Sequence, residues 1–270
     1  MTTKKMKRQR FKNKMRNILL TISYDGTNFC GWQRQDQKTG EMRTVQGEIE
    51  KALEKIHKTH IDLAGSGRTD SGVHAAGQAA NFFTPIDSIP VEKFPIALNS
   101  FLPNDVRIMA AKVVPDTFSA RFSATSRTYR YFLHCGLSPL ASEMPFVWAL
   151  HRRPDINRLN DMASRLFGET DCATFAAAGD QSLSTNRYID KAVFYPEGEK
   201  IVFEITANAF LWKMVRSLTG SFVHFEKMGL TGDDFEEILN SRDRKKAGPT
   251  APPQGLFLWS IDFDGLRRHV

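Results

Sequence analysis

Strand-like and helix-like segments follow one another irregularly along this chain, and their order restricts the folds available to it. In a doubly wound parallel sheet each strand is followed by a helix, whereas here two strands repeatedly follow each other directly. The first part of the sequence reads as strand, helix, strand, strand, helix and strand, and the second part has a loosely similar order. The pattern therefore predicts an α+β fold.

Apolar periodicity and turn residues locate the individual elements. In the first part, Thr44 is expected to cap a helix, another helix is expected at 91–101, and strands are expected at 17–24, 61–63, 76–83 and 105–114. In the second part, helices are expected at 155–167, 210–228 and 232–240, and strands at 128–134, 187–195, 200–206 and 256–263. The shared order is what an internal duplication would leave, although no repeat at a fixed period is present.

The net charge of +7 is unevenly distributed along the 270 residues. Residues 1–16 contain eight lysines and arginines and no acidic residue, which leaves 29 basic against 30 acidic residues in the rest. We therefore expect a basic tail (1–16) followed by a nearly neutral N-terminal half (17–115) and C-terminal half (116–270). Any nucleic-acid site on the two halves must then come from a local cluster of basic residues, to which the tail would add a non-specific electrostatic arm.

The cysteines and the apolar runs bear on the compartment. Cys30, Cys135 and Cys172 are far apart and form no CxxC pair, so a disulfide framework and a zinc ribbon are both disfavoured. The sequence has no HExxH motif, and its histidines do not cluster. No run of 18 apolar residues is present, and the apolar stretch after the basic start is too short for a signal peptide. We expect a cytoplasmic protein with free thiols, no membrane span and no metal.

Residues 65–74, GSGRTDSGVH, are the densest candidate for a functional loop. Glycines allow close approach of the backbone to a ligand, and Arg68 and Asp70 lie among them. The segment lacks the GxxxxGK[ST] pattern of a phosphate-binding loop, and Asp70 occupies the place of the third glycine in a dinucleotide fingerprint. Two readings stay open from the residues alone: a ligand-binding loop, or a polar turn with a surface Arg–Asp pair.

Residues 118–131 combine arginines, hydroxyl groups and aromatic rings. Arg121, Arg127 and Arg130 are suited to phosphate contacts, and Tyr129 is suited to stacking on an unpaired base. Alternation along the strand places the tyrosines on one face and Arg130 on the other, as in any half-buried strand. A strand with one face toward RNA would satisfy both readings. The basic loop with Arg242, Arg244, Lys245 and Lys246 is a further candidate for RNA contact.

Arg216 follows an apolar stretch, Ala209–Val215, that is expected to be helical. A buried arginine at this position would need a carboxylate partner, because an unpaired buried charge is costly. Asp70 is one candidate for that partner, and a solvent-facing Arg216 is the alternative.

Five motifs occur in one order along residues 17–264: YDGTNFCGWQRQ at 24–35, GRTDSGVHA at 67–75, ARFSATSRTYRY at 120–131, NAFLWKMVR at 208–216 and TAPPQGLFL at 250–258. Together they resemble the tRNA pseudouridine synthase A family. Ser71 stands where that family usually has alanine, and 211–213 is a stretch that varies. No position that carries the family's chemistry is altered.

The resemblance implies roles for individual residues. Asp70 matches the catalytic aspartate, Tyr129 the tyrosine that contacts the target base, Arg68 the arginine associated with nucleotide flipping, and Arg216 the partner of the aspartate. It also implies two related ferredoxin-like α+β halves, a central antiparallel-rich sheet and an RNA-binding cleft between the halves. The implied activity is isomerisation of uridine at positions 38 to 40 of tRNA, by a homodimer without cofactor or metal.

The chemistry fits the residues present. Pseudouridine formation breaks the C1′–N1 bond and rejoins the uracil through C5, with no net redox change or phosphate transfer. A single carboxylate can act as the nucleophile or abstract a sugar proton, and the sequence leaves both routes open. Two rival functions are an RNA-binding protein without turnover, which the intact motifs disfavour, and a nucleotide hydrolase, for which phosphate motif and metal ligands are missing.

Overall fold

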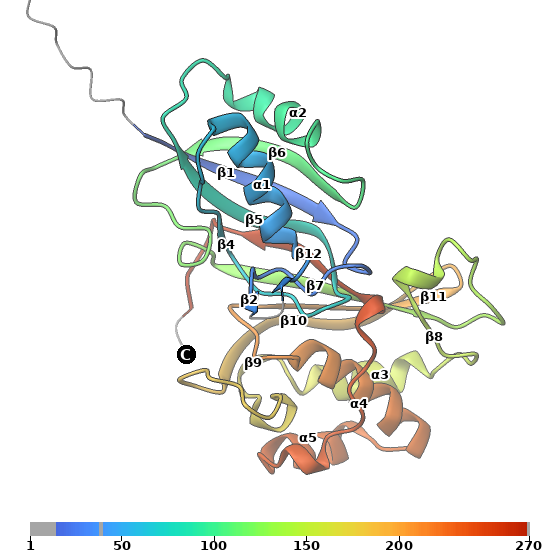
Figure 1. Cartoon of the computed structure of the whole chain (residues 1–270). Coiled ribbons are helices and arrows are strands. Elements are labelled where there is room, and N and C mark those ends of the chain that lie inside the picture. The colour runs from blue at the N-terminus through green and yellow to red at the C-terminus, as the bar shows by residue number, and fades with distance from the viewer. Residues whose placement is uncertain (1–14, 38–39, 269–270) are drawn as a thin grey trace, which may run out of the picture.

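One large, mostly antiparallel sheet runs through the protein (Figure 1). The computed structural model describes residues 15–37 and 40–268. Along the sheet the strands lie in the order β6 (Val106–Val114), β1 (Arg16–Tyr24), β5 (His74–Thr84), β12 (Leu256–Asp262), β7 (Ser126–His134), β11 (Lys200–Ala207), β10 (Asn186–Glu197) and β9 (Gly168–Asp171). Short strands β4 (Ala64–Gly65) and β8 (Trp148–Ala149) pair with β5 and β7. The predicted α+β class with an antiparallel-rich central sheet is confirmed.

The helices divide between the two parts of the chain. The first part contributes α1 (Val45–His57) and α2 (Phe94–Asn99), and the second contributes α3 (Ile156–Ser164), α4 (Met214–Met228) and α5 (Gly232–Asn240). Short 3₁₀ turns lie at 91–93, 144–146, 173–175, 244–246 and 253–255, and β2 (Asp36–Gln37) pairs with β3 (Gly40–Glu41) apart from the main sheet. Among the described residues, no helix is long and apolar enough to cross a membrane.

Both parts follow the same plan of strand, helix, two strands, helix and strand. In the first, β6 and β5 flank β1, and β4 pairs with the other edge of β5. In the second, the neighbours run β12, β7, β11 and β10. Each part therefore arranges its fourth, first, third and second strands side by side, which is the strand order of a ferredoxin-like unit. The last strand β12 joins the two units, because it pairs with β7 on one edge and with β5 on the other.

Local sequence explains the first helix. The Thr44 side chain accepts a hydrogen bond from the Gly47 backbone, so it caps α1 as predicted. Val45, Ile49 and Leu53 recur at helical spacing and are fully buried against the strands of the N-terminal unit. The burial of this helix face positions the loop that precedes α1. That loop contacts the candidate site, because the Trp32 N–H donates to the Thr69 carbonyl.

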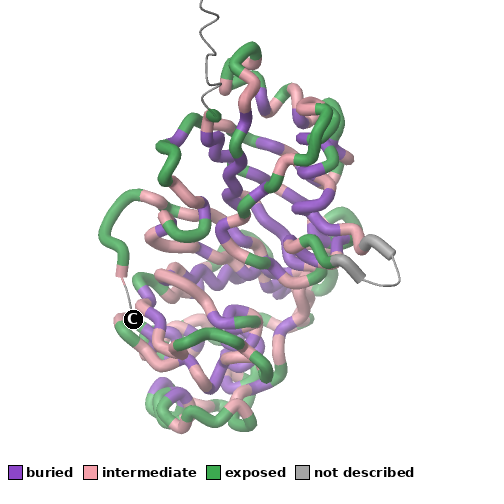
Figure 2. Tube along the Cα trace, turned by 60° about the vertical axis from the view of Figure 1, so that its left-hand side comes forward, coloured by how far each residue is buried: buried purple, intermediate pink, exposed green. Residues whose placement is uncertain are grey.

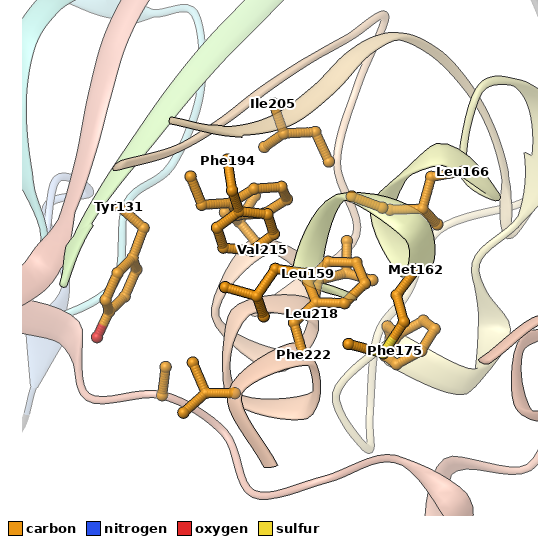
Figure 3. Close-up of a cluster of buried hydrophobic side chains, with 14 of the residues drawn as sticks. Tyr131, Leu159, Met162, Leu166, Phe175, Phe194, Ile205, Val215, Leu218 and Phe222 are labelled. Carbon is orange, nitrogen blue, oxygen red and sulfur yellow. The ribbon is translucent and has the colours of Figure 1, made fainter. Parts of the chain in front are cut away.

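The C-terminal unit has its own core beneath α4 (Figure 3). Val215, Leu218 and Phe222 of α4 are buried, and the Phe222 ring lies 5.5 Å from the Phe194 ring on β10. Complete burial of one such side chain contributes about 1.5–3 kcal/mol to the stability of the fold. Figure 2 shows that buried stretches follow the strands throughout the molecule, while exposed stretches lie mainly in connections and outer helix faces. The start of α4 is therefore held firmly.

Two predicted boundaries are wrong. The strand expected at 61–63 is absent, and only Ala64–Gly65 pairs with β5. The helix expected from 210 begins at Met214, because Lys213 has a left-handed backbone with φ of 58°. The backbone before Met214 makes hydrogen bonds with a distant segment instead of helical ones: the N–H of Trp212 bonds to Asp180 and its carbonyl to Ala177. The sequence also gave no prediction of β8 or β9.

Candidate active site

The glycine-rich loop is fixed between β4 and β5 by contacts with the segment that follows β1. The hydroxyls of Thr69 and Tyr24 are hydrogen-bonded at 2.7 Å, and the Trp32 backbone N–H donates to the Thr69 carbonyl at 3.2 Å. Ser71 donates from its hydroxyl to the Phe29 carbonyl at 3.0 Å. These contacts surround Asp70 on both sides and hold its backbone in place.

Gly31 makes this close packing of the two segments achievable. Its φ of 94° lies in the left-handed region, and a Cβ at this position would lie 2.6 Å from the Thr69 carbonyl oxygen. A larger residue would therefore be strained and would push the glycine-rich loop away. This explains why the motif at 24–35 and the motif at 67–75 occur together in one chain.

The Asp70 carboxylate accepts hydrogen bonds from two residues of the C-terminal unit. Arg216 Nη1 lies 3.0 Å from Oδ2, and Trp212 Nε1 lies 3.0 Å from Oδ1. The exposed fractions of the side chains are 23% for Asp70 and 14% for Arg216, so the ion pair is partly shielded from water. The pairing of Arg216 with Asp70, suggested as one alternative by the sequence, is present.

Arg216 is itself oriented by the motif at 250–258. Its Nε donates to the Ala251 carbonyl at 2.8 Å, and the Ala251 N–H donates to the Arg216 carbonyl at 3.0 Å. The Tyr131 hydroxyl donates to the neighbouring Pro252 carbonyl at 2.7 Å, which anchors the same segment to β7. One side of the guanidinium is thereby fixed, and the other side is presented to Asp70.

Tyr129 lies next to this ion pair on the same face of β7 as Tyr131. Its ring meets Phe210 edge-on, with ring centroids 5.0 Å apart. Burial raises the pKa of Tyr129 to about 12, with nearby Arg127 opposing the shift and Asp70 adding to it. Among the described residues, the Tyr129 hydroxyl has no hydrogen-bond partner. Tyr129 is therefore a neutral phenol near the carboxylate, with its hydroxyl available to a ligand.

Arg127 braces the site through the backbone. Its guanidinium donates to the carbonyls of Asn208 and Arg121, at 2.7 and 3.0 Å, and reaches the Ser66 hydroxyl at 3.5 Å. Burial lowers the pKa of Arg127, as expected where no carboxylate lies against it. It connects the start of the glycine-rich loop to the segment before α4.

Of the remaining predicted arginines, Arg68 lies beside Asp70 on the same loop, whereas Arg121 and Arg130 are not gathered around it. Arg130 points to the opposite face of the sheet, where its Nε lies 2.6 Å from Glu204 Oε2 and its guanidinium lies 4.0 Å from the Trp259 ring. Arg68 is exposed on the loop beside Asp70, and Arg121 is exposed near the start of β7. The structure thus brings together Asp70, Arg216, Tyr129 and Arg127, but not Arg130.

Trp212 is the contact to Asp70 that sequence reasoning missed. It falls in the stretch 211–213, which was treated as variable, and it comes before the helix that presents Arg216. The only signal in the sequence is an indole donor four residues before Arg216. That signal becomes meaningful only once the helix is known to start at Met214.

One group of side chains has the composition of a metal site, but its contacts explain it otherwise. Glu50, His60 and Asp62 offer ligand atoms within 4.8 Å of one another. The Glu50 carboxylate already accepts hydrogen bonds from Arg34, Gln46 and the Leu63 backbone, at 2.9, 3.0 and 3.2 Å. These contacts satisfy the buried carboxylate and link α1 to β4, which is a structural role.

Comparisons with known proteins agree on one family. A family model described as tRNA pseudouridine synthase matches residues 20–123 and 162–264. The chain is 60% identical over 249 residues to tRNA pseudouridine synthase A of Treponema denticola, covering 92% of this chain and 93% of the relative. The corresponding protein of Treponema pallidum (strain Nichols) is 52% identical over 238 residues, covering 88% and 85%. That of Brachyspira hyodysenteriae is 42% identical over 244 residues, covering 90% and 96%.

Proposed function

This chain belongs to the tRNA pseudouridine synthase family, and we propose that it isomerises uridine to pseudouridine in the anticodon stem-loop of tRNA, at positions 38 to 40. Asp70 is the proposed catalytic residue. The observation that carries this proposal is the single, partly shielded carboxylate of Asp70, whose two oxygens accept hydrogen bonds from Arg216 and Trp212. The Arg216 guanidinium lies 3.0 Å from this carboxylate, and both candidate routes use the carboxylate as a nucleophile or a base.

In the nucleophilic route, an Asp70 oxygen forms a bond to the substrate while the C1′–N1 bond breaks, and the bond to the enzyme is released when C1′ joins C5. In the elimination route, Asp70 takes a proton from the sugar and later returns it. Either way the C5 proton leaves to solvent and N1 gains a proton, so atoms and electrons balance without a redox partner.

Tyr129 and Arg68 are proposed to stabilise the target nucleotide after it has left its stack. The target uridine must leave its stack, which costs a few kcal/mol. Stacking on the Tyr129 ring would offset about 1–3 kcal/mol of that cost, and the free hydroxyl adds a polar contact to the base. Arg68 is exposed beside Asp70, where it can fill the space that the flipped nucleotide leaves or hold its phosphate.

Further RNA contacts are proposed at Arg121, Arg127 and Arg130. Arg121 is exposed and available for a phosphate, whereas Arg127 and Arg130 would exchange present protein contacts for RNA. We also propose a cytoplasmic homodimer, with halves at 17–115 and 116–270 and a cleft for RNA between them. Residues 1–14 of the basic tail lie outside the described residues, so its role as an electrostatic arm stays a prediction.

The test is release of tritium from tRNA labelled at C5 of uridine. Purified protein is expected to release one tritium for each pseudouridine formed in the anticodon stem-loop. Transcripts in which the uridines at positions 38 to 40 are replaced by cytidine serve as the matched control and are expected to release none. Tight tRNA binding without tritium release, at enzyme equal to tRNA, would favour the rival reading of an RNA-binding protein without turnover.

A further inference from the structure

Trp212 has an unusual setting for a tryptophan. The residue is 47% exposed, yet its indole N–H points at Asp70 Oδ1 at 3.0 Å. We propose that Trp212 is a positioning residue for the Asp70 carboxylate, and that Asp180 holds Trp212 in place for this task. This inference rests on the proposed function of Asp70 and names a second residue that acts through it.

Two donors are needed to fix a carboxylate in one orientation. The terminal torsion of an aspartate has a broad energy minimum, so a single hydrogen bond from Arg216 to Oδ2 leaves the group free to rotate. A second donor on Oδ1 defines the plane of the carboxylate and therefore the direction of its remaining lone pairs. An oxygen that must meet one atom of the nucleotide benefits from this restriction, because misplacement at a reacting centre is costly.

The backbone of Trp212 is held by a separate loop. Its N–H donates to Asp180 Oδ2, and its carbonyl accepts from the Ala177 N–H at 3.0 Å. Asp180 Oδ1 accepts from the Ser182 N–H at 2.8 Å, so both oxygens of this carboxylate are used. Partial burial opposes ionisation, but the hydrogen bonds from Ser182 and Trp212 hold the pKa of Asp180 below its usual range. The loop 177–182 thus holds the backbone of Trp212 through two hydrogen bonds.

The residue after Trp212 completes the arrangement. Lys213 has a φ of 58°, a left-handed conformation that is rare outside glycine, and its Nζ lies 4.7 Å from the centre of the Trp212 ring. This turn keeps Trp212 outside α4, whereas a continuous helix would carry its side chain elsewhere. The left-handed backbone of Lys213 is energetically unfavourable for a residue with a side chain, and it directs the Trp212 indole at Asp70.

An ordinary packing role would not produce these contacts. A half-exposed ring buries little apolar area, and its polar edge faces a carboxylate instead of water. A surface for stacking RNA bases is the other candidate role, since the ring is accessible. The two roles are separable, because Trp212→Phe keeps an aromatic ring for stacking and removes only the N–H donor and part of the ring area.

The first experiment reads the contact without using activity. Protein labelled with ¹⁵N-tryptophan contains four indole N–H groups, and Trp212→Phe identifies the signal of Trp212. We expect Asp70→Asn to move this signal, because it replaces the carboxylate that accepts the indole N–H with a neutral amide. The Trp148 indole, which lies in β8, is the internal control. A Trp212 signal that is indifferent to Asp70→Asn overturns the inference, whatever the enzyme's activity.

The second experiment reads the consequence in single-turnover kinetics. Trp212→Phe is expected to slow pseudouridine formation roughly tenfold, the size of one hydrogen bond to a charged group. The affinity for tRNA is expected to stay within about twofold. Trp212→His, which retains an N–H donor, is expected to restore part of the rate, and Asp180→Ala to show a smaller effect in the same direction.

The controls separate the possible outcomes. Trp148→Phe is the matched substitution away from the site and is expected to leave the single-turnover rate unchanged. A Trp212→Phe enzyme with the wild-type single-turnover rate, combined with weaker tRNA binding by Trp212→Leu, would overturn positioning in favour of stacking. A wild-type protein that forms no pseudouridine would contradict the proposed function instead, and the indole signal would still report whether Trp212 contacts Asp70.

Discussion

The two halves of the protein share one plan but differ at one connection. In the C-terminal half, the second and third strands are β10 and β11, with 12 and 8 residues, and they meet in a tight turn at Gly198–Glu199. In the N-terminal half, the second strand is only Ala64–Gly65, and the connection to β5 carries Asp70. The second strand of the repeated plan is therefore short in the N-terminal half, and the longer connection that follows it carries the candidate site residue Asp70.

The short second strand also leaves part of the β5 edge free for the other half. β4 pairs with β5 at Ala80 and Asn81, whereas β12 pairs with it at His74 and Ala75. The two halves are joined next to the Asp70 loop for this reason. The intact half then contributes the rigid elements: α4 with Arg216 and β7 with Tyr129. The candidate site needs a loop from one half and a stable scaffold from the other.

The largest effect is expected from removing the negative charge of Asp70 on the loop of the N-terminal half. Asp70→Asn keeps the size of the side chain but removes the nucleophile or base, so pseudouridine formation is expected to fall about a thousandfold or more. The affinity for tRNA, measured by filter binding, is expected to change less than twofold. Asp62→Asn, an exposed residue of the same half, is the matched control. Wild-type activity in Asp70→Asn would show that the loop does not carry the chemistry.

The next test breaks the contact between loop and scaffold. Arg216→Lys keeps the positive charge but cannot hold Asp70 and the Ala251 carbonyl with one planar group. We expect the single-turnover rate to fall about a hundredfold, and the free energy of unfolding in urea to fall by about 1–2 kcal/mol, discounted because the pair is partly exposed. An unchanged rate with reduced stability would assign Arg216 to the fold alone.

Sequence reasoning succeeded where local pattern decides the outcome. The Thr44 cap, the strand that became β1 and the alternation of Tyr129 and Arg130 about the sheet all follow from short-range chemistry. It failed where distant partners compete with the local pattern. The start of α4 was predicted too early because the Trp212 backbone N–H bonds to the side chain of Asp180, which lies 32 residues before it.

The arginines show the same limit for the site. For Arg216 the residues alone left a carboxylate partner and a solvent-facing side chain both open, the family resemblance named Asp70 as the partner, and the structure shows this ion pair. Arg127 was grouped with Arg121 and Arg130 as RNA contacts by composition. Its guanidinium instead donates to the backbone carbonyls of Asn208 and Arg121 and to the Ser66 hydroxyl. Which arginine faces ligand and which faces protein depends on tertiary placement, so composition alone does not distinguish them.

A smaller effect on the reaction rate is expected when the Tyr129 hydroxyl, the proposed contact to the target base, is removed. Tyr129→Phe keeps the ring against Phe210 and removes the hydroxyl that has no protein partner. Because stacking is retained, we expect the single-turnover rate to fall only about three- to tenfold, with nearly unchanged tRNA affinity. Tyr188→Phe on β10 is the control for loss of a tyrosine hydroxyl elsewhere. A rate equal to wild type would mean that the hydroxyl takes no part in the reaction.

The smallest effect concerns the junction of the halves at His74. Burial lowers the pKa of His74, despite the opposing influence of Asp25, so the ring is neutral in the folded protein. Its Nδ1 accepts from the Gly26 N–H at 3.0 Å, and its Nε2 donates to the Pro145 carbonyl at 3.0 Å, which links the N-terminal half to the loop after β7. Protonation would remove the acceptor at Nδ1 and place a charge beside the Phe146 and Phe257 rings, and Asp25 Oδ1, 3.2 Å from Nδ1, only partly offsets the cost of burying that charge.

The sign of the pH effect follows from this neutral ring. The unfolded state binds a proton at the ordinary histidine pKa of about 6.5, whereas the folded state binds it only at lower pH. Stability contributed by His74 is therefore complete above that value and is lost as pH falls below it. Urea unfolding between pH 7.5 and 5 is expected to show a steeper loss for wild type than for His74→Asn, although the variant is less stable at neutral pH. If the stability of wild type and of His74→Asn fell in parallel with pH, protonation of His74 would not affect the junction. The β5–β12 pairing would then join the two halves without a pH-dependent contribution from this ring.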